Sequence, residues 1–409
     1  MKKAASSIIA AGVVATSVMA ADAAITASKV DADLSRISYS SKIWANTKFS
    51  DVVLYPQTTI RQNDKKANEI NANNKAKKAE VAAVYNGTDI AFMIKWADAT
   101  MNIQTYNPEK LLTSYKSDQY SDGFAVQFAA DGSDVERLPY IGMGSEGRPV
   151  VVHLQKAAQG VFESNGDGNV YYQLNRNQTE LFGDDLATFD RKVKNLGSND
   201  YERTFISEGF RSMTEIKDSS SDSHARLGYK AGSWMGTLSR PLQDEYANLD
   251  SGAVPVAFAV WDGEKLGRDG IKNISQWVSV KLDGKPGGEA LITALAEKAS
   301  GDAAKGKEAV AVNGCVGCHQ VEETDAPNLM GPTLSNIGGY NTAAYLRESL
   351  KAPSAVVVPG YNRNAHSNYM WYTEENGKRT STMTDYSWLD DETLNDIVAY
   401  LQTLKAEVE

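Results

Sequence analysis

The pattern of apolar and polar positions divides the chain of 409 residues into a strand-rich part and a helical part. From Tyr39 to about Asp283, short apolar runs alternate with segments rich in Gly, Asp, Asn and Ser. Runs of this length that contain β-branched and aromatic residues predict strands. The predicted strands cover residues 52–55, 81–85, 90–96, 124–128, 150–154, 234–238, 254–261 and 277–282. This spacing predicts a mainly antiparallel β-sandwich.

Two local features refine this prediction. The segment Asn86-Gly87-Thr88-Asp89 separates two predicted strands, and its Asn-Gly pair favours a hairpin turn. Between Phe162 and His224 the composition changes to Asn, Asp, Ser and Arg. This change indicates an inserted surface excursion with some helix around residues 184–196. The simplest interpretation of the excursion is a solvated loop system without chemistry.

The pattern becomes helical after residue 283. Residues 284–300 are predicted to be a linker, in which a glycine-rich start is followed by an alanine-rich helical stretch from Glu289 to Ala299. Another helix is expected from Gly301 to Val312. A last helix begins with acidic residues at 390–392 and carries an apolar stripe, formed by Leu394, Ile397, Val398, Leu401 and Leu404. The sequence thus predicts a β-sandwich followed by a small all-α domain over residues 301–409.

The chain contains two cysteines, and both belong to the pentapeptide Cys315-Val316-Gly317-Cys318-His319. This spacing lets two thiols form thioether bonds to haem while the adjacent imidazole of His319 ligates the iron. A thioredoxin-like redox pair would not need the adjacent histidine. A zinc site would need further ligands at close spacing, and His153, His224 and His366 lie elsewhere in the chain. The motif therefore predicts one covalent haem c.

Covalent attachment of haem requires export, and the N-terminus has the features of an export signal. Lys2 and Lys3 precede an apolar stretch from Ile8 to Val18, and small residues around Ala20 and Ala23 suit cleavage. We therefore expect a signal peptide over residues 1–23 and a soluble periplasmic protein, with an uncleaved tether as the alternative. The formal net charge of −10 argues against nucleic acid as a partner and suits a basic redox partner.

Several motifs of the strand-rich part occur in the order found in a known family. They are Val53–Gln57, Ile94–Thr100, Asp122–Phe128, Pro139–Gly144, Trp234–Leu242 and Phe258–Gly263. Residues 24–283 thereby resemble the ethylbenzene-dehydrogenase-like haem-binding domain. That family comprises γ subunits of molybdenum enzymes of the dimethyl sulfoxide reductase superfamily, and similar domains occur in nitrite oxidoreductase. The resemblance implies a β-sandwich that holds one non-covalent haem b between a methionine and a lysine.

The resemblance assigns the two ligands of haem b by their position in the motifs. Met143, between two glycines, matches the family's methionine, and flanking glycines let a backbone approach a porphyrin closely. Lys272 fits the family's C-terminal motif, and Lys230 is the alternative. Burial of the lysine would have to oppose its protonation, because only a neutral amine can ligate iron. Without the resemblance, Met143 would be interpreted as a core methionine and Lys272 as a solvated loop residue.

Residues 301–409 resemble a class I cytochrome c, which implies further roles for residues around the motif. In that family a glycine of the first helix packs on an aromatic residue of the last, and Gly306 and Tyr400 are the candidates. The carbonyl of Pro332 is expected to support the proximal imidazole. Met383 is the preferred sixth ligand of the iron, although Thr384 replaces the usual proline after it. The other candidates are Met330, Met370 and His366.

Together these features predict an electron-transfer protein with one haem b and one haem c and no catalytic residues. The resemblance implies that it associates with a molybdenum-containing catalytic subunit and an iron–sulfur subunit. It would pass electrons to or from a soluble or membrane redox carrier. Two alternatives remain open: a peroxidase-like haem enzyme with one open coordination position, and a sensor or binding module that has lost haem b.

Overall fold

The structure is a computed structural model. It describes residues 24–57, 69, 73–103, 120–130, 137–157, 201–209, 212–216, 222–268, 270–321, 330–358 and 369–409. The expected signal peptide, the expected helix around residues 184–196 and His366 lie outside the described residues. Among the described residues, no helix is long and apolar enough to cross a membrane.

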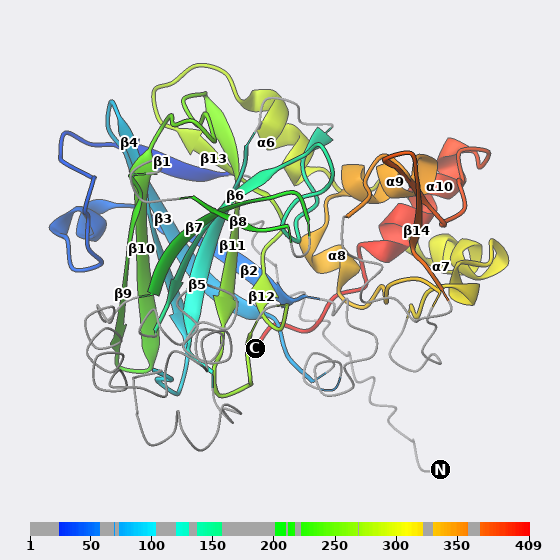
Figure 1. Cartoon of the computed structure of the whole chain (residues 1–409), viewed down its shortest axis with the longest axis horizontal. Helices are drawn as coiled ribbons and strands as arrows, with labels where there is room; N and C mark the ends of the chain where they lie inside the picture. Colours follow the sequence, from blue (N-terminus) through cyan, green and yellow to red (C-terminus); the bar gives the residue numbers. More distant parts are fainter. Residues whose placement is uncertain are drawn as a thin grey trace, which may run out of the picture.

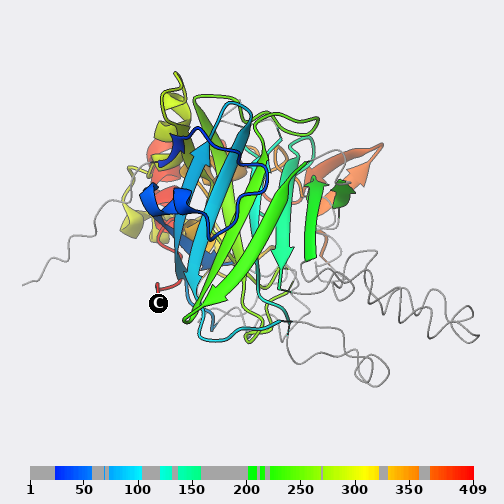
Figure 2. The same cartoon turned by 90° about the vertical axis from the view of Figure 1, so that its left-hand side faces the viewer.

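Most strands of the N-terminal part belong to one curled sheet whose two layers face each other (Figure 1). The first layer contains β8 (Thr214–Ile216), β7 (Tyr201–Ser207), β6 (Val150–Lys156), β5 (Gly123–Ala129), β11 (Ala253–Trp261) and β13 (Val278–Leu282). The second layer, which faces the viewer in Figure 2, contains β2 (Ser50–Pro56), β3 (Lys77–Tyr85), β4 (Asp89–Ala97), β10 (Ser233–Pro241) and β9 (His224–Lys230). The short strands β1 (Ile25–Lys29) and β12 (Asn273–Ile274) join the layers. The predicted β-sandwich is confirmed.

The space between the layers holds the main apolar core. The rings of Phe92 and Phe128 lie 5.7 Å apart, and those of Phe92 and Phe258 lie 6.1 Å apart. Because side chains alternate along a strand, every second residue of β5 and β11 points into this core. The inward residues are bulky, namely Phe124, Val126, Phe128, Val254, Val256, Phe258 and Val260. This face of the first layer therefore stabilises the sandwich by burial of large apolar side chains.

The predicted hairpin is confirmed, and two strands are additional. β3 and β4 pair antiparallel, and the side-chain oxygen of Asn86 accepts hydrogen bonds from the backbone of Thr88 and Asp89. The second layer is also covered on its outer face, where Trp44 of the 3-10 helix η1 (Lys42–Asn46) packs among buried residues of β3 and β4. The prediction of a loop excursion is wrong for its last part, since β7 pairs with β6 and β8 with β7.

The C-terminal part is mainly helical and lies beside the first layer (Figure 1). Its elements are α6 (Glu289–Ala296), α7 (Ala303–Val312), the 3-10 helix η4 (Cys315–Gly317), α8 (Ile337–Tyr340), α9 (Ala343–Lys351) and α10 (Asp391–Leu401). A hairpin of β14 (Tyr372–Glu375) and β15 (Lys378–Ser381) is added to the predicted helices. The helical stretch expected within the linker occurs as α6, which buries Leu291 and Leu295 against the sandwich.

The first and last helices of the C-terminal domain begin at aspartate caps and cross at a glycine. Asp302 accepts hydrogen bonds from two backbone amides of α7, and Asp390 accepts one from Thr393 of α10. A Cβ atom on Gly306 would lie 1.9 Å from the carbonyl oxygen of Asp396 and 2.9 Å from the Cβ of Tyr400. Only glycine allows the two backbones to approach this closely. The expected contact of Gly306 with Tyr400 is confirmed.

Candidate haem-binding sites

The Cys-x-x-Cys-His motif forms one compact turn directly after α7. The carbonyl oxygen of Cys315 accepts hydrogen bonds from the backbone amides of Cys318, at 3.1 Å, and His319, at 2.9 Å. Both thiols are half-buried and neither belongs to a disulfide. The three side chains that the motif contributes are therefore gathered within about one helical turn, as attachment of haem c requires.

The imidazole of His319 is held by the segment that follows it in the chain. Its Nδ1 lies 2.7 Å from the carbonyl oxygen of Pro332. A carbonyl oxygen can only accept, so Nδ1 carries the hydrogen and Nε2 keeps its lone pair for a metal. The expected support by Pro332 is confirmed. A Cβ atom on Gly331 would lie 2.7 Å from Cε1 of His319, so the backbone of this segment packs directly on the ring.

The surroundings of the motif favour the neutral forms of His319 and Cys315. Burial lowers the pKa of His319, although its hydrogen bond to Pro332 acts in the opposite direction. Burial also raises the pKa of the Cys315 thiol, and the nearby hydroxyl of Tyr386 partly opposes this shift. A neutral imidazole with a free Nε2 and two unlinked thiols fits covalent haem. When bound, haem c supplies an iron that takes up and releases one electron.

The candidates for the sixth ligand differ in their surroundings. Met383 is partly buried and packs on the same apolar cluster as Cys315. Met330 directly precedes Gly331 and is 44% exposed, and Met370 is 53% exposed. The partial burial of Met383 in the cluster that contains Cys315 favours it over the two exposed methionines, and its ligation of iron stays a prediction.

The second candidate site lies on the outer face of the first layer. There β5 and β11 carry small, buried side chains, in contrast to the bulky residues on their inner face. The small residues are Gly123, Ala125, Ala129, Ala253, Ala257 and Ala259. A surface of small side chains allows a flat group to approach the strands closely.

The turn that carries Met143 rests on this outer face. The side-chain amide of Gln127 on β5 donates to the carbonyl oxygen of Ile141 at 2.9 Å. The indole of Trp277 donates to the carbonyl oxygen of Pro139, also at 2.9 Å. Met143 itself adopts a left-handed backbone conformation with φ of 79°. This conformation is uncommon for a residue other than glycine, and such residues concentrate at functional sites.

Lys272 directly precedes β12 and reaches the same face near the end of β5 that lies opposite the turn of Met143. Its side chain is 8% exposed, and its Nζ lies 5.5 Å from the centre of the Trp261 ring. Trp261 pairs with Gly123, four residues before Gln127 on β5. At about 3.3 Å per residue, the two anchoring positions are about 13 Å apart. Met143 and Lys272 thus belong to opposite ends of one face, and their ligation of a shared iron stays a prediction.

The structure separates the candidate lysines and adds one that the sequence did not indicate. Lys230 ends β9 at the edge of the second layer and is exposed, so its burial does not match that of an iron ligand. Lys156 is 4% exposed, and its Nζ lies 4.0 Å from the centre of the Trp261 ring. The only signal for Lys156 in the sequence is a charged residue at the end of an apolar strand. Lys272 remains the predicted ligand, with Lys156 beside it.

The turn of Met143 also contacts the C-terminal domain. The guanidinium of Arg148 forms two hydrogen bonds with the carboxylate of Glu348 on α9, at 2.7 and 2.9 Å. The rings of Tyr140 and Tyr345 lie 5.5 Å apart. The backbone amide of Glu146 donates to the carbonyl oxygen of Val357. One short segment thus connects the outer face of the sandwich with the domain that carries Cys315.

Comparisons with known proteins agree with this division of the chain. The family model described as Ethylbenzene dehydrogenase matches residues 41–273, and the model described as Cytochrome c matches residues 303–405. A Haloferax mediterranei protein named as a respiratory nitrate reductase heme subunit is 25% identical over 188 residues. That match covers 45% of this chain and 48% of the relative, so the chain spans about half of the relative's length.

Solved structures resemble the sandwich only distantly. A family 9 carbohydrate binding module from Caldicellulosiruptor kristjanssonii in complex with cellotriose is 8% identical, with a TM-score of 0.31. The likeness covers 65% of this chain and 96% of the module. The same module in complex with glucose is also 8% identical, with a TM-score of 0.30, over 64% of this chain and 96% of the module.

Proposed function

Because this chain belongs to the ethylbenzene dehydrogenase family, we propose that it is a dihaem electron-transfer subunit of a molybdenum oxidoreductase. One haem c is attached to Cys315 and Cys318, with His319 and Met383 as iron ligands. One haem b is held between Met143 and Lys272. The subunit relays electrons between the molybdenum enzyme with its iron–sulfur subunit and a soluble or membrane redox carrier. It acts in the periplasm after removal of its signal peptide.

One observation carries this proposal more than any other: the segment that contains Met143 contacts both the sandwich and the domain that carries Cys315. It rests on Gln127 of the sandwich, and its neighbour Arg148 pairs with Glu348 of the helical domain. Arg148 is 8% exposed, so water screens this ion pair less than a surface pair. A rigid connection of this kind supports a fixed spacing between two haems, which suits electron transfer within the chain.

The residues of the candidate sites also support a role in electron transfer rather than a role in catalysis. His319 offers one nitrogen to iron, and the predicted sixth positions are thioether or amine groups of the chain. Iron with six ligands from protein and porphyrin has no open position for a substrate. The relative named as a reductase heme subunit supports the same role at a coarser level.

Ligand-binding spectroscopy on the purified holoprotein tests the proposal. Two haems with six ligands should leave the reduced spectrum unchanged when carbon monoxide is added, and the oxidised spectrum unchanged with cyanide. A haem that binds either ligand rapidly would instead favour a peroxidase-like enzyme. Affinity purification of the native protein should also recover a molybdenum-containing subunit, identified by its metal content. Recovery of the chain without molybdenum would contradict the assignment to such a complex.

A further inference from the structure

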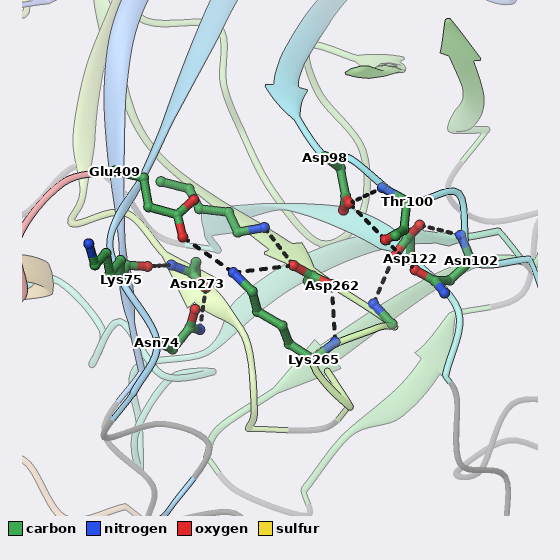
Figure 3. Close-up of polar contacts among 12 residues, drawn as sticks. Asn74, Lys75, Asp98, Thr100, Asn102, Asp122, Asp262, Lys265, Asn273 and Glu409 are labelled. Atoms are coloured by element: carbon green, nitrogen blue, oxygen red, sulfur yellow. Dashed lines mark hydrogen bonds and ion pairs between the residues drawn. The ribbon is translucent and has the colours of Figure 1, made fainter. Parts of the chain in front are cut away.

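Three carboxylates meet at one end of the sandwich, away from the cysteine motif. Asp98 follows β4, Asp122 precedes β5 and Asp262 follows β11. One oxygen of each lies within 4.8 Å of the other two. Figure 3 shows the side chains of Asp98 and Asp122 turned toward each other. Acidic groups repel one another at such distances unless a cation or a proton lies between them.

One oxygen of this cluster has no hydrogen-bond donor. The Oδ2 atom of Asp98 is buried and accepts no hydrogen bond from the described part of the chain. Asp98 as a whole is only 6% exposed, so bulk water does not replace the missing donor. A buried carboxylate oxygen without a partner is costly, and a bound cation removes that cost.

The loop after Asp98 adds further oxygens to the cluster. The hydroxyl of Thr100 lies 3.1 Å from Oδ1 of Asp98 and 2.9 Å from Oδ1 of Asn102. Thr100 has one hydroxyl hydrogen, so it can donate to only one of these two oxygens at a time. Oxygen ligands at alternate positions of one loop, together with a carboxylate from another strand, suit a hard divalent cation.

The positive charges near the cluster are concentrated on one of its three members. The Nζ atom of Lys77 lies 2.8 Å from Oδ2 of Asp262, and the Nζ atom of Lys265 lies 3.7 Å from the same oxygen. Within the described ranges, neither Asp98 nor Asp122 forms an ion pair with a lysine or arginine. Asp122 accepts hydrogen bonds from the backbone amides of Asn102 and Gly263 and from the indole of Trp234. The carboxylate oxygen of this pair that lacks a donor is therefore Oδ2 of Asp98.

We propose that this cluster binds one calcium ion between Asp98 and Asp122, with oxygens of Thr100 and Asn102 as further ligands. The ligands are all oxygens, and neither histidine nor cysteine contributes, which favours calcium over zinc, copper or iron. Calcium accepts irregular arrangements of oxygens more readily than magnesium does. Asp262 lies at one side of the site, and the ion pair with Lys77 balances its charge.

The position of this site gives it a structural role. A cation there connects the ends of β4, β5 and β11, which come from distant parts of the chain. Trp261, whose ring faces the Nζ of Lys272, directly precedes Asp262. Calcium should therefore stabilise the end of the sandwich from which Lys272 approaches the outer face. The site itself does not depend on the presence of either haem.

Isothermal titration calorimetry with calcium chloride tests the proposal. The sample is the complete holoprotein, which is first freed of cations with EGTA. One calcium should bind per chain, and magnesium chloride at equal concentration should bind at least about tenfold more weakly. At calcium concentrations 100-fold above the dissociation constant, the melting temperature should rise by about 5 °C or more. Absence of both the binding heat and the thermal shift in wild-type protein would overturn the proposal.

Variants locate the site. Asp98→Asn keeps the shape of the side chain and should weaken calcium binding by about tenfold or more. Asp89→Asn, at the opposite end of the same strand, should bind calcium as the wild type does. If Asp98→Asn does not fold, Asn102→Ala should show the weakened binding, because it removes one oxygen and keeps both carboxylates. Calcium binding that neither variant weakens would place the ion elsewhere and overturn this assignment.

Discussion

The Nδ1 of His319 donates a hydrogen bond of 2.7 Å to the carbonyl oxygen of Pro332, and Gly331 lies between them along the chain. This bond sets the direction in which Nε2 of the imidazole points. Because the backbone of Gly331 packs on the ring, the orientation of the iron ligand depends on a residue without a side chain. The proximal side of the candidate haem c site is therefore formed by the chain's own backbone.

Replacement of Gly331 with alanine should displace the imidazole of His319. The added Cβ atom would lie 2.7 Å from Cε1 and 2.9 Å from Nδ1, which is closer than atoms pack. Overpacking of this kind costs about 1–3 kcal/mol, so the domain should melt earlier and retain less covalent haem. Haem-stained denaturing gels and thermal denaturation measure both effects. Gly317→Ala is the matched control, since a Cβ atom there meets nothing within 4 Å. Equal behaviour of the two variants would contradict this account.

The sixth ligand of haem c can be identified with two methionine variants. Met383→Ala should abolish the weak charge-transfer band of sulfur–iron ligation in the oxidised spectrum. It should also lower the reduction potential by about 100 mV or more, because a thioether favours ferrous iron. Met330→Ala should leave the band and the potential unchanged. The reverse pattern in redox titrations of the two variants would transfer the role to Met330.

The ligands of haem b can be tested in the same way with lysine variants. Lys272→Ala should lower the occupancy of haem b and the melting temperature of the sandwich, because haem stabilises only the folded state. Each kcal/mol lost should shift that temperature by about 2–4 °C. The haem c spectrum should not change. Lys230→Ala should have little effect, as its side chain is exposed. Loss of haem b in Lys156→Ala but not in Lys272→Ala would move the ligand to Lys156.

The stability of the sandwich should depend on pH through His153. This histidine is 3% exposed, accepts from Arg240 through Nε2 and donates to Thr204 through Nδ1. Burial, and then the charge of Arg240, lower its pKa well below 6.5. The unfolded chain therefore binds a proton below pH 6.5 that the folded chain does not. Stability should decrease as pH falls from 6.5, by about 1.4 kcal/mol per pH unit.

Denaturant unfolding at several pH values measures this dependence. His153→Gln keeps a donor and an acceptor but cannot be protonated, so its stability should decrease less between pH 6.5 and pH 5. The same slope in His153→Gln and in the wild type would show that other groups carry the dependence.

Features set by neighbouring residues could be predicted from the sequence. The hairpin at Asn86, the turn of the Cys-x-x-Cys-His motif and the final helix with its acidic start all depend on local patterns, and all occur in the structure. The central strands could also be predicted, because each contains a run of several consecutive apolar residues. Several of their ends coincide with the predicted ranges, others extend up to four residues beyond them, and β13 begins one residue later than predicted.

Features set by distant residues could not be predicted from the sequence. Arg148 and Glu348 lie 200 positions apart, and neither has a neighbour in the chain that indicates the ion pair. β7 lies in a polar segment whose strand conformation depends on pairing with β6. The carboxylates of Asp98, Asp122 and Asp262 meet only because three strands end at one place. Sequence patterns report local conformation and burial, whereas these contacts depend on how the sheet curls.

The haem content of the purified protein tests the dihaem proposal most directly. The pyridine haemochrome assay, performed before and after extraction with acidified acetone, counts total and covalent haem per chain. We expect two haems in total, of which one is extracted as haem b and one remains attached. The double variant Cys315→Ala, Cys318→Ala should retain only extractable haem. A wild-type protein with covalent haem alone, and nothing to extract, would contradict the account.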